Sequence, residues 1–161
     1  MSSKKRDKSV SIIILVRHGH TPTTGKILPG RAKGLHLSEL GKEQASKAAT
    51  NLSMLENVTA VYASPMERTL ETAKPIASAF GLKVQRNRGL IEADFGKWTG
   101  RKLSDLRKLS DWEIVQKNPS LFRFPDGESF IEIQSRMVET ITRISDKHRG
   151  EIVIAVSHAD T

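Results

Sequence analysis

Two arginines and two histidines stand where the ends of neighbouring strands would gather them into one anion-binding cleft. Arg17 and His18 directly follow an apolar run, Arg68 stands just after a second run, and His158 follows the last one. Arginine offers a fork of donors that matches the oxygens of a phosphate, and a neutral imidazole can carry a covalent intermediate. Nearby guanidinium charges disfavour the imidazolium form and keep such a nucleophile free to attack phosphorus. A departing alkoxide also needs a proton, so this chemistry requires a carboxylic acid as well.

The elements that must position these residues alternate between strands and helices. Apolar runs predict strands at residues 11–16, 58–63, 82–86 and 152–157, and the first and last of them are expected to be buried on both faces of a parallel sheet. Helical spacing of apolar residues predicts longer helices over residues 38–56, 64–81 and 129–149. This alternation predicts an α/β fold with a largely parallel sheet, whose ligands gather beyond the carboxyl ends of the strands.

Two of the predicted helices begin with a recognisable start signal. Ser64 and Glu67 are expected to form a capping box, in which a serine side chain and a glutamate three residues later bind each other's backbone N–H groups. Ser129 and Glu132 repeat the same spacing before the longest helix. Residues 87–127, between these helices, are predicted to be mostly irregular.

Five motifs follow one another along most of the chain, from residue 14 to its end. They are Arg17-His18-Gly19, residues 30–45 beginning with Gly30-Arg31, residues 64–73 around Arg68, residues 90–100 around Glu92, and residues 156–159 around His158. An Arg-His-Gly tripeptide alone occurs by chance, so the ordered set carries the argument. In this order the motifs resemble those of the histidine phosphatase (phosphoglycerate mutase-like) superfamily. The resemblance implies a three-layer α/β sandwich with a largely parallel central sheet.

The resemblance also implies a role for each polar residue of these motifs. His18 is the expected nucleophile, which becomes phosphorylated, and Glu92 is the expected acid, which protonates the leaving oxygen and then activates water. The residues expected to bind the phosphoryl oxygens are Arg17, Arg68, His158 and Thr24. At the last of these positions many members of the family carry asparagine. No metal or other cofactor is implied. The remaining histidines, which we expect on the surface or in loops, are His20, His36 and His148.

The segment around Glu92 bears on which reaction of the family to expect. Asp94 is an alternative acid, but the spacing to Phe95-Gly96 favours Glu92. Phosphoglycerate mutases usually have Glu-Arg followed by Tyr-Gly here, whereas this chain has Glu92-Ala93 and Phe95-Gly96. This pattern favours hydrolysis of phosphate monoesters, with phosphoglycerate mutase-type transfer as the alternative. The expected partner is a small phosphorylated metabolite.

Two functions of other classes stay open at this point. His18, His20, His158 and Asp160 could serve a metal-dependent hydrolase, although a barrel hydrolase of that kind usually needs far more chain. A non-enzymatic anion-binding domain is the other alternative, since a fold does not dictate a function. The formal net charge of +8 suits small anions as well as nucleic acids. An aromatic content of 5% is low for stacking on bases, so no nucleic-acid partner is expected.

Composition and the two ends of the chain set further expectations. Residues 1–10 are expected to be a flexible basic tail, and residues 11–161 a single domain. No segment is long enough to span a membrane, and no cleavage site follows the first apolar run, so neither membrane insertion nor export is expected. The absence of cysteine fits a reducing cytoplasm. Domains similar to this one usually continue with another helix and strand, so C-terminal elements are expected to be missing after Thr161.

Overall fold

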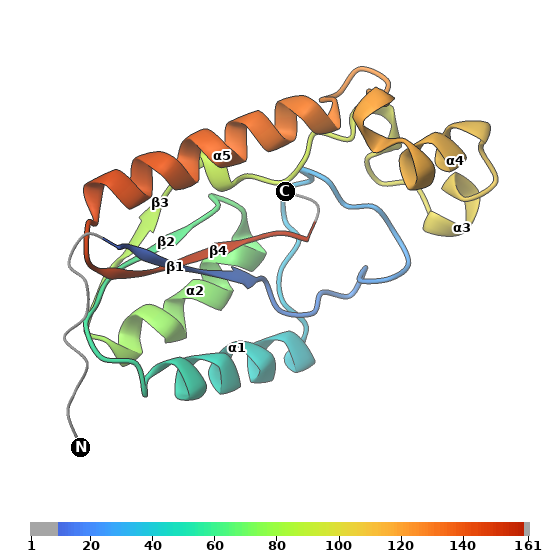
Figure 1. Ribbon diagram of the computed structural model, residues 1–161. Helices are drawn as coiled ribbons and strands as arrows, with labels where there is room; N and C mark the ends of the chain where they lie inside the picture. Colours follow the sequence, from blue (N-terminus) through green and yellow to red (C-terminus); the bar gives the residue numbers. More distant parts are fainter. Residues whose placement is uncertain (1–9, 160–161) are drawn as a thin grey trace.

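The core of the protein is a parallel sheet whose strands appear where the apolar runs predict them. The computed structural model describes residues 10–159, so the expected basic tail at residues 1–10 lies outside the described residues except for Val10. The strands are β1 (Ile12–Arg17), β2 (Val58–Ala63), β3 (Val84–Arg86) and β4 (Ile152–Ser157), arranged in the order β1-β4-β2-β3 with every pairing parallel (Figure 1). The prediction of an α/β fold with a parallel sheet is confirmed.

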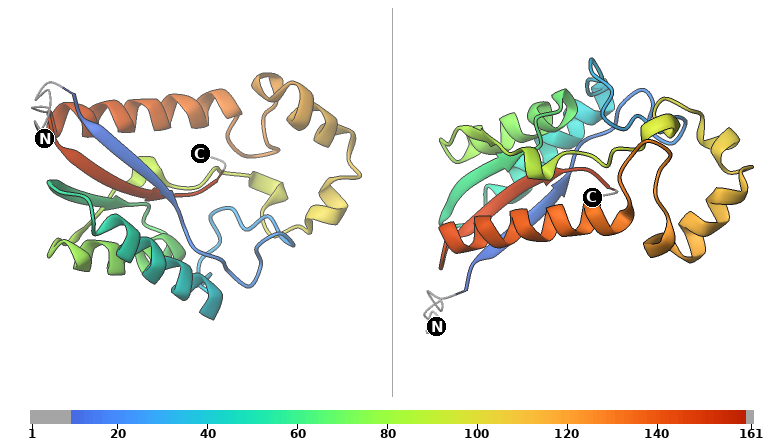
Figure 2. Two further views of the ribbon diagram at one scale, coloured as in Figure 1. Left: turned by 60° about the horizontal axis from the view of Figure 1, so that its bottom comes forward. Right: turned by 90° about the horizontal axis from the view of Figure 1, so that it is seen from above.

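Helices cover both faces of this sheet and make a three-layer sandwich. Helices α1 (Glu39–Leu52) and α2 (Glu67–Ala79) lie on one face, and α5 (Phe130–Lys147) crosses the other, as Figure 2 shows from two further directions. Apolar side chains of α1 and α2 form one buried cluster with alternate residues of β2 and β4. The intervening residues of the same strands pack against α5 in a second cluster. The alternation of strand side chains therefore builds two cores from one sheet.

A lobe of short helices extends beyond the carboxyl ends of the strands (Figure 1). It contains α3 (Leu103–Leu106), α4 (Ser110–Lys117) and two single turns of 3-10 helix at residues 96–98 and 119–121. A third such turn, at residues 88–90, follows β3 and packs in the core beneath α5. A third cluster of buried aromatic side chains holds the lobe together, among them Phe95, Trp98, Phe122 and Phe124. The lobe thus forms one wall above the sheet edge where the expected site lies.

The prediction that the first strand is buried on both faces is wrong. Strand β1 lies at an edge of the sheet, and its Leu15 side chain is 59% exposed. Ile14 and Val16 pack against the core beneath α1 and α2, and Ile13 packs against the core beneath α5. The continuous apolar run describes β4 correctly, because β4 lies between β1 and β2 and is almost wholly buried.

Of the two predicted capping boxes, the structure contains one. Ser129 and Glu132 form both reciprocal hydrogen bonds at the start of α5. Helix α2 instead begins at Glu67 after Met66, without a side-chain cap, so the predicted box at Ser64 is wrong. The physical reason is that the Ser64 hydroxyl is hydrogen-bonded to Nε2 of His158 at 2.8 Å. A residue expected to cap a helix is therefore part of the polar centre.

Close backbone contact explains two glycines in the predicted motifs. Gly19 follows His18, and an added Cβ there would lie 2.5 Å from the carbonyl oxygen of Gly41 in α1. An added Cβ at Gly41 would lie 2.1 Å from the carbonyl oxygen of His20. Both distances are far below van der Waals contact, so the loop after β1 and the first turn of α1 meet backbone to backbone.

We expect Gly41→Ala to destabilise the protein although alanine favours helices. Its methyl group would force the loop after β1 away from α1, an overpacking that typically costs about 1–3 kcal/mol. Urea denaturation should show the loss, and Ser46→Ala, at an exposed position of the same helix, should change stability by no more than about 0.5 kcal/mol. Equal stability of the two variants would contradict the close contact.

Candidate active site

The carboxyl ends of three neighbouring strands bring the predicted polar residues together. Arg17 ends β1 and His18 follows it, while His158 follows the adjacent strand β4. The pairing of these strands continues past their ends, because the His18 N–H donates to the carbonyl of Ser157 at 3.0 Å. Arg68 lies in the first turn of α2, just after β2. The rings of His18 and His158 meet edge to face with centroids 5.3 Å apart.

His18 presents one ring nitrogen as an acceptor toward the site. Its Nδ1 lies 2.8 Å from the carbonyl oxygen of Gly19, which can only accept, so Nδ1 carries the proton. The lone pair on Nε2 accepts from Nε of Arg68 at 3.3 Å. Burial, joined by the charges of Arg68 and Arg17 and opposed by the bond to Gly19, lowers the pKa of His18 to about 4. The ring is neutral at neutral pH, with its electron pair on Nε2.

The side chain of Arg68 is wholly buried at the centre of this group. One terminal nitrogen, NH2, donates to the carbonyl oxygen of Gly30 at 2.9 Å and to Nδ1 of His158 at 3.2 Å, and lies 3.9 Å from Oε2 of Glu92. The other, NH1, is buried without a hydrogen-bond partner among residues 10–159. Burial lowers the pKa of Arg68, and the negative charge of Glu92 opposes this shift. Arg68 is thus a buried cation with an unused donor.

His158 is a neutral partner of Arg68. Because its Nδ1 accepts from Arg68, its Nε2 carries the proton and donates to Oγ of Ser64. Burial lowers the pKa of His158 to about 2, with a further contribution from the charge of Arg68. Both imidazoles therefore direct a lone pair toward the same guanidinium group.

Glu92, and not Asp94, lies in this polar centre. The Glu92 side chain is 5% exposed, its Oε2 lies 3.5 Å from Nδ1 of His158, and its Oε1 accepts from the Ala93 N–H at 2.9 Å. The Asp94 side chain is 41% exposed and pairs with Arg31 at 3.2 Å instead. Sequence spacing favours Glu92 over Asp94 as the acid, and the positions of the two side chains agree with that choice.

The polar centre opens into two adjoining cavities that share Arg17, His18 and Thr24. The first, of about 250 Å³, extends toward His20 and Gln44. The second, of about 240 Å³, has Glu92 in its wall and apolar side chains opposite, namely Ile27, Leu28, Leu103 and Trp112. His18 and Glu92 therefore face one space that is large enough for a small ligand. Thr24 lines both cavities, and its Oγ1 accepts from the Thr21 N–H at 2.9 Å.

The other histidines agree only in part with the prediction of surface or loop positions. His36 is exposed and pairs with Glu71, and His20 is bonded to Ser38 in its loop. His148 lies in the turn after α5, as a loop residue, but it is buried and not at the surface. Its Nε2 lies 3.0 Å from the Tyr62 hydroxyl and its Nδ1 2.7 Å from a carboxylate oxygen of Glu151, contacts between elements that a sequence does not display.

Sequence reasoning missed several residues that hold the centre in place. The sequence predicts Ser64 as a helix start, and Arg31 appears there only as part of the motif at residues 30–45. The Arg31 side chain instead donates from Nε to the carbonyl oxygen of Glu92 at 2.8 Å. Glu128 and Arg136, which surround the same segment, were not singled out at all. Their acidic and basic side chains stand close to the predicted acid only after the chain has folded.

Residues 10–159 contain neither a cluster of metal ligands nor a helix able to cross a membrane. Residues 10–159 hold no group of three His, Cys, Asp or Glu side chains arranged to bind a metal ion. Asp160, which the metal-hydrolase alternative requires, lies outside these residues. No helix within the same range combines the length and apolar character needed to cross a membrane.

Comparisons with known proteins agree with this geometry. The sequence model of the histidine phosphatase superfamily (branch 1) matches residues 13–161. Phosphoserine phosphatase 1 of Hydrogenobacter thermophilus is 33% identical over 151 residues, which cover 91% of this chain and 70% of that protein. Phosphoglycerate mutase-like protein 4 of Arabidopsis thaliana is 30% identical over 156 residues, covering 94% of this chain and 68% of that protein.

Solved structures give the same result for the fold. The phosphoserine phosphatase of Entamoeba histolytica, solved in complex with 3-phosphoglyceric acid, superposes with a TM-score of 0.82 at 25% identity, over 93% of this chain and 75% of that one. The match of the sequence model spans nearly all of the chain, and His18, Arg68, Glu92 and His158 converge on one polar centre. The chain belongs to the histidine phosphatase superfamily and is an enzyme that acts on phosphate esters.

Proposed function

We propose that this protein hydrolyses the phosphate monoesters of small metabolites in two steps, with Nε2 of His18 as the nucleophile. The observation that carries this proposal is the pair formed by His18 and Arg68. The unprotonated Nε2 accepts from Nε of Arg68 at 3.3 Å, and this buried guanidinium group still has an unused donor at NH1. A phosphoryl group bound beside this pair would take over Nε2 from Arg68, receive its attack, and give the unpartnered NH1 an anionic acceptor.

In the first step Nε2 of His18 forms a bond to phosphorus while the bond from phosphorus to the substrate oxygen breaks. Arg17 and Arg68 stabilise the charge on the phosphoryl oxygens, as transfer of this group depends mainly on positioning and electrostatics. His158 and Thr24 complete the oxygen contacts. Glu92, in its protonated form, gives its proton to the departing oxygen, so that the product leaves as a neutral alcohol.

In the second step a water molecule attacks the phosphorus of phosphohistidine. Glu92, now a carboxylate, takes one proton from this water, the bond between phosphorus and nitrogen breaks, and inorganic phosphate leaves with His18 restored. The same carboxyl group thus serves first as acid and then as base. Its place in the wall of the cavity next to His18 supports both roles.

Hydrolysis is favoured over a mutase reaction by the sequence around Glu92 and by the relatives. The chain has Ala93 and Phe95 where mutases usually have Arg and Tyr. The relative from Hydrogenobacter thermophilus is named phosphoserine phosphatase 1. The phosphoserine phosphatase of Entamoeba histolytica was solved in complex with 3-phosphoglyceric acid. We therefore propose a small phosphorylated metabolite as substrate. The cytoplasmic location and the lack of a nucleic-acid partner remain predictions from the composition of the chain.

His18→Ala should abolish phosphoenzyme formation and lower turnover by about a thousandfold or more, because the variant lacks the attacking electron pair of Nε2. The measurement is acid-labile incorporation of labelled phosphate from a phosphomonoester, with mutase activity on phosphoglycerate assayed alongside. His36→Ala, at an exposed position, is the matched control and should keep wild-type activity. If the His18→Ala variant still incorporated labelled phosphate and kept its activity, the role of His18 as nucleophile would be refuted. A mutase rate above the rate of hydrolysis would show that the mutase reaction is the correct choice.

Glu92→Gln should slow hydrolysis most for substrates with poor leaving groups. An alkyl phosphate needs a proton on its departing oxygen and should lose about a hundredfold in kcat/KM, whereas an activated aryl phosphate needs little help and should lose much less. Asp94→Asn is the comparison variant. Equal losses on both substrates, or a larger selective loss in the Asp94 variant, would contradict the role of Glu92.

A further inference from the structure

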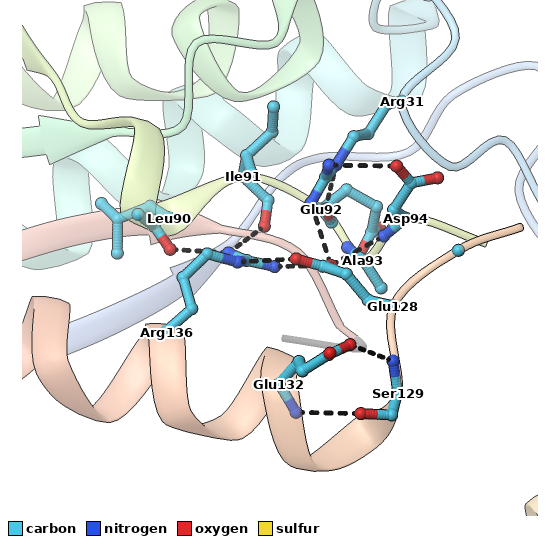
Figure 3. Close-up of polar contacts among 12 residues, drawn as sticks. Arg31, Leu90, Ile91, Glu92, Ala93, Asp94, Glu128, Ser129, Glu132 and Arg136 are labelled. Carbon is cyan, nitrogen blue, oxygen red and sulfur yellow. Dashed lines mark hydrogen bonds and ion pairs between the residues drawn. The ribbon is translucent and has the colours of Figure 1, made fainter. Parts of the chain in front are cut away.

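A cluster of charged side chains surrounds the backbone of Glu92 and its neighbours. It consists of Arg31 from the loop after β1, Glu128 from the turn before α5, and Arg136 from α5 itself. Figure 3 shows Glu128 between the two guanidinium groups. None of the three lines the cavities next to His18, so the proposed reaction does not use them directly.

Glu128 is the centre of this charged cluster. Its Oε2 accepts from NH2 of Arg31 at 2.9 Å, from NH2 of Arg136 at 3.1 Å and from the Asp94 N–H at 2.9 Å. Its Oε1 accepts from Nε of Arg136 at 3.2 Å. Burial raises the pKa of Glu128, but the hydrogen bonds from Arg136 and the Asp94 N–H and the charges of both arginines outweigh it, so the pKa lies below its usual value. Glu128 is ionised at neutral pH.

The two arginines connect Glu128 to the backbone on both sides of the proposed acid. NH1 of Arg136 donates to the carbonyl oxygens of Gly89 at 2.7 Å and Ile91 at 2.9 Å. Nε of Arg31 donates to the carbonyl oxygen of Glu92 itself at 2.8 Å. With the bond from Asp94 to Glu128, the segment is held by side chains before, at and after Glu92 (Figure 3).

This arrangement fixes a segment that has no regular secondary structure of its own. Residues 91–95 lie between two turns of 3-10 helix and belong to no strand. A catalytic group must stay within a fraction of an ångström of its productive position, and a displacement of 1 Å costs about a hundredfold in rate. Removing the charge of Glu128 would take away the partner that Arg31 and Arg136 share and leave Arg31 with its ion pair to Asp94, so both arginines would hold the Glu92 backbone less firmly.

A neighbouring ion pair lacks hydrogen bonds to the backbone around Glu92 and therefore serves as a comparison. Glu132 pairs with Arg123, and it closes the capping box with Ser129. Both charged side chains are about half exposed, at 49% and 57%, and neither has a hydrogen bond to residues 89–94 among those found in residues 10–159. Glu132 therefore provides a matched glutamate four residues away that stabilises the start of α5 alone.

We infer that Glu128 is a positioning residue, which acts through Arg31 and Arg136 to hold Glu92 where it can protonate the leaving group. The inference rests on the proposed function, because it assigns Glu128 an effect only through the acid role of Glu92. Disturbing Glu128 should therefore change how the rate depends on the leaving group, which a loss of stability alone would not do.

The test compares Glu128→Gln with Glu132→Gln on an alkyl phosphate and an activated aryl phosphate. Glu128→Gln should lose about ten- to a hundredfold in kcat/KM on the alkyl phosphate and within about threefold on the aryl phosphate. Glu132→Gln should lose thermal stability but keep the wild-type ratio of the two rates. Equal losses on both substrates in Glu128→Gln, or the same change of ratio in both variants, would overturn the inference.

The double variant Glu92→Gln/Glu128→Gln separates this inference from the proposed function. If Glu128 acts through Glu92, the double variant should be no slower on the alkyl phosphate than Glu92→Gln alone, whereas independent effects would multiply. Multiplied losses would overturn the inference and leave the role of Glu92 standing. A Glu92→Gln variant without leaving-group dependence would refute the acid role, and the inference with it. Should Glu128→Gln not fold, Arg136→Lys, which lacks the fork of donors, must show the same selective loss.

Discussion

Burying the guanidinium group of Arg68 is costly unless acceptors surround it, and the polar centre is arranged around that requirement. An unpaired buried charge costs several kcal/mol or more. The nearest acceptors come from four separate parts of the chain: the carbonyl oxygen of Gly30, Nε2 of His18, Nδ1 of His158 and Oε2 of Glu92. Only the folded sheet brings these segments together, so the motif residues depend on one another for their positions.

The same requirement fixes the protons on both histidines. Each imidazole must present a lone pair to Arg68, so each carries its proton on the far nitrogen. For His18 that proton goes to the carbonyl oxygen of Gly19, and for His158 it goes to the hydroxyl of Ser64. The backbone contact between Gly19 and Gly41 holds the first of these acceptors against α1. A nucleophilic imidazole in a cationic site is thus a consequence of how the cation is buried.

Much of this centre could be predicted from the sequence, because strand ends and ordered motifs are local features. The positions after β1 and β4 placed His18 and His158 side by side, and motif spacing separated Glu92 from Asp94. These features rest on periodicity and on the rule that parallel strands deliver their ends to one edge of the sheet.

The sequence did not reveal the roles of residues whose side chains pair with partners far away in the chain. Ser64 stands at the spacing of a capping box, yet its hydroxyl serves His158 across the site. Glu128 and Arg136 look like ordinary surface charges until α5 packs near residues 89–94. The apolar run of β1 matches a central strand as well as an edge strand, and only the strand order distinguishes the two. Tertiary contacts of this kind leave no periodic pattern in a chain.

The central claim is that burial of His18 beside Arg68 keeps Nε2 as a neutral electron-pair donor, and nitrogen NMR of the histidine rings tests it most directly. Spectra of ¹⁵N-labelled protein between acidic and neutral pH report both the tautomer and the pKa of each ring. The account predicts that His18 carries its proton on Nδ1 and takes up a second proton only as the pH falls toward about 4. Nucleophilic reactivity should therefore persist below pH 6.5, where an ordinary histidine becomes charged. A proton on Nε2 at neutral pH, or a midpoint near the ordinary value of 6.5, would contradict it.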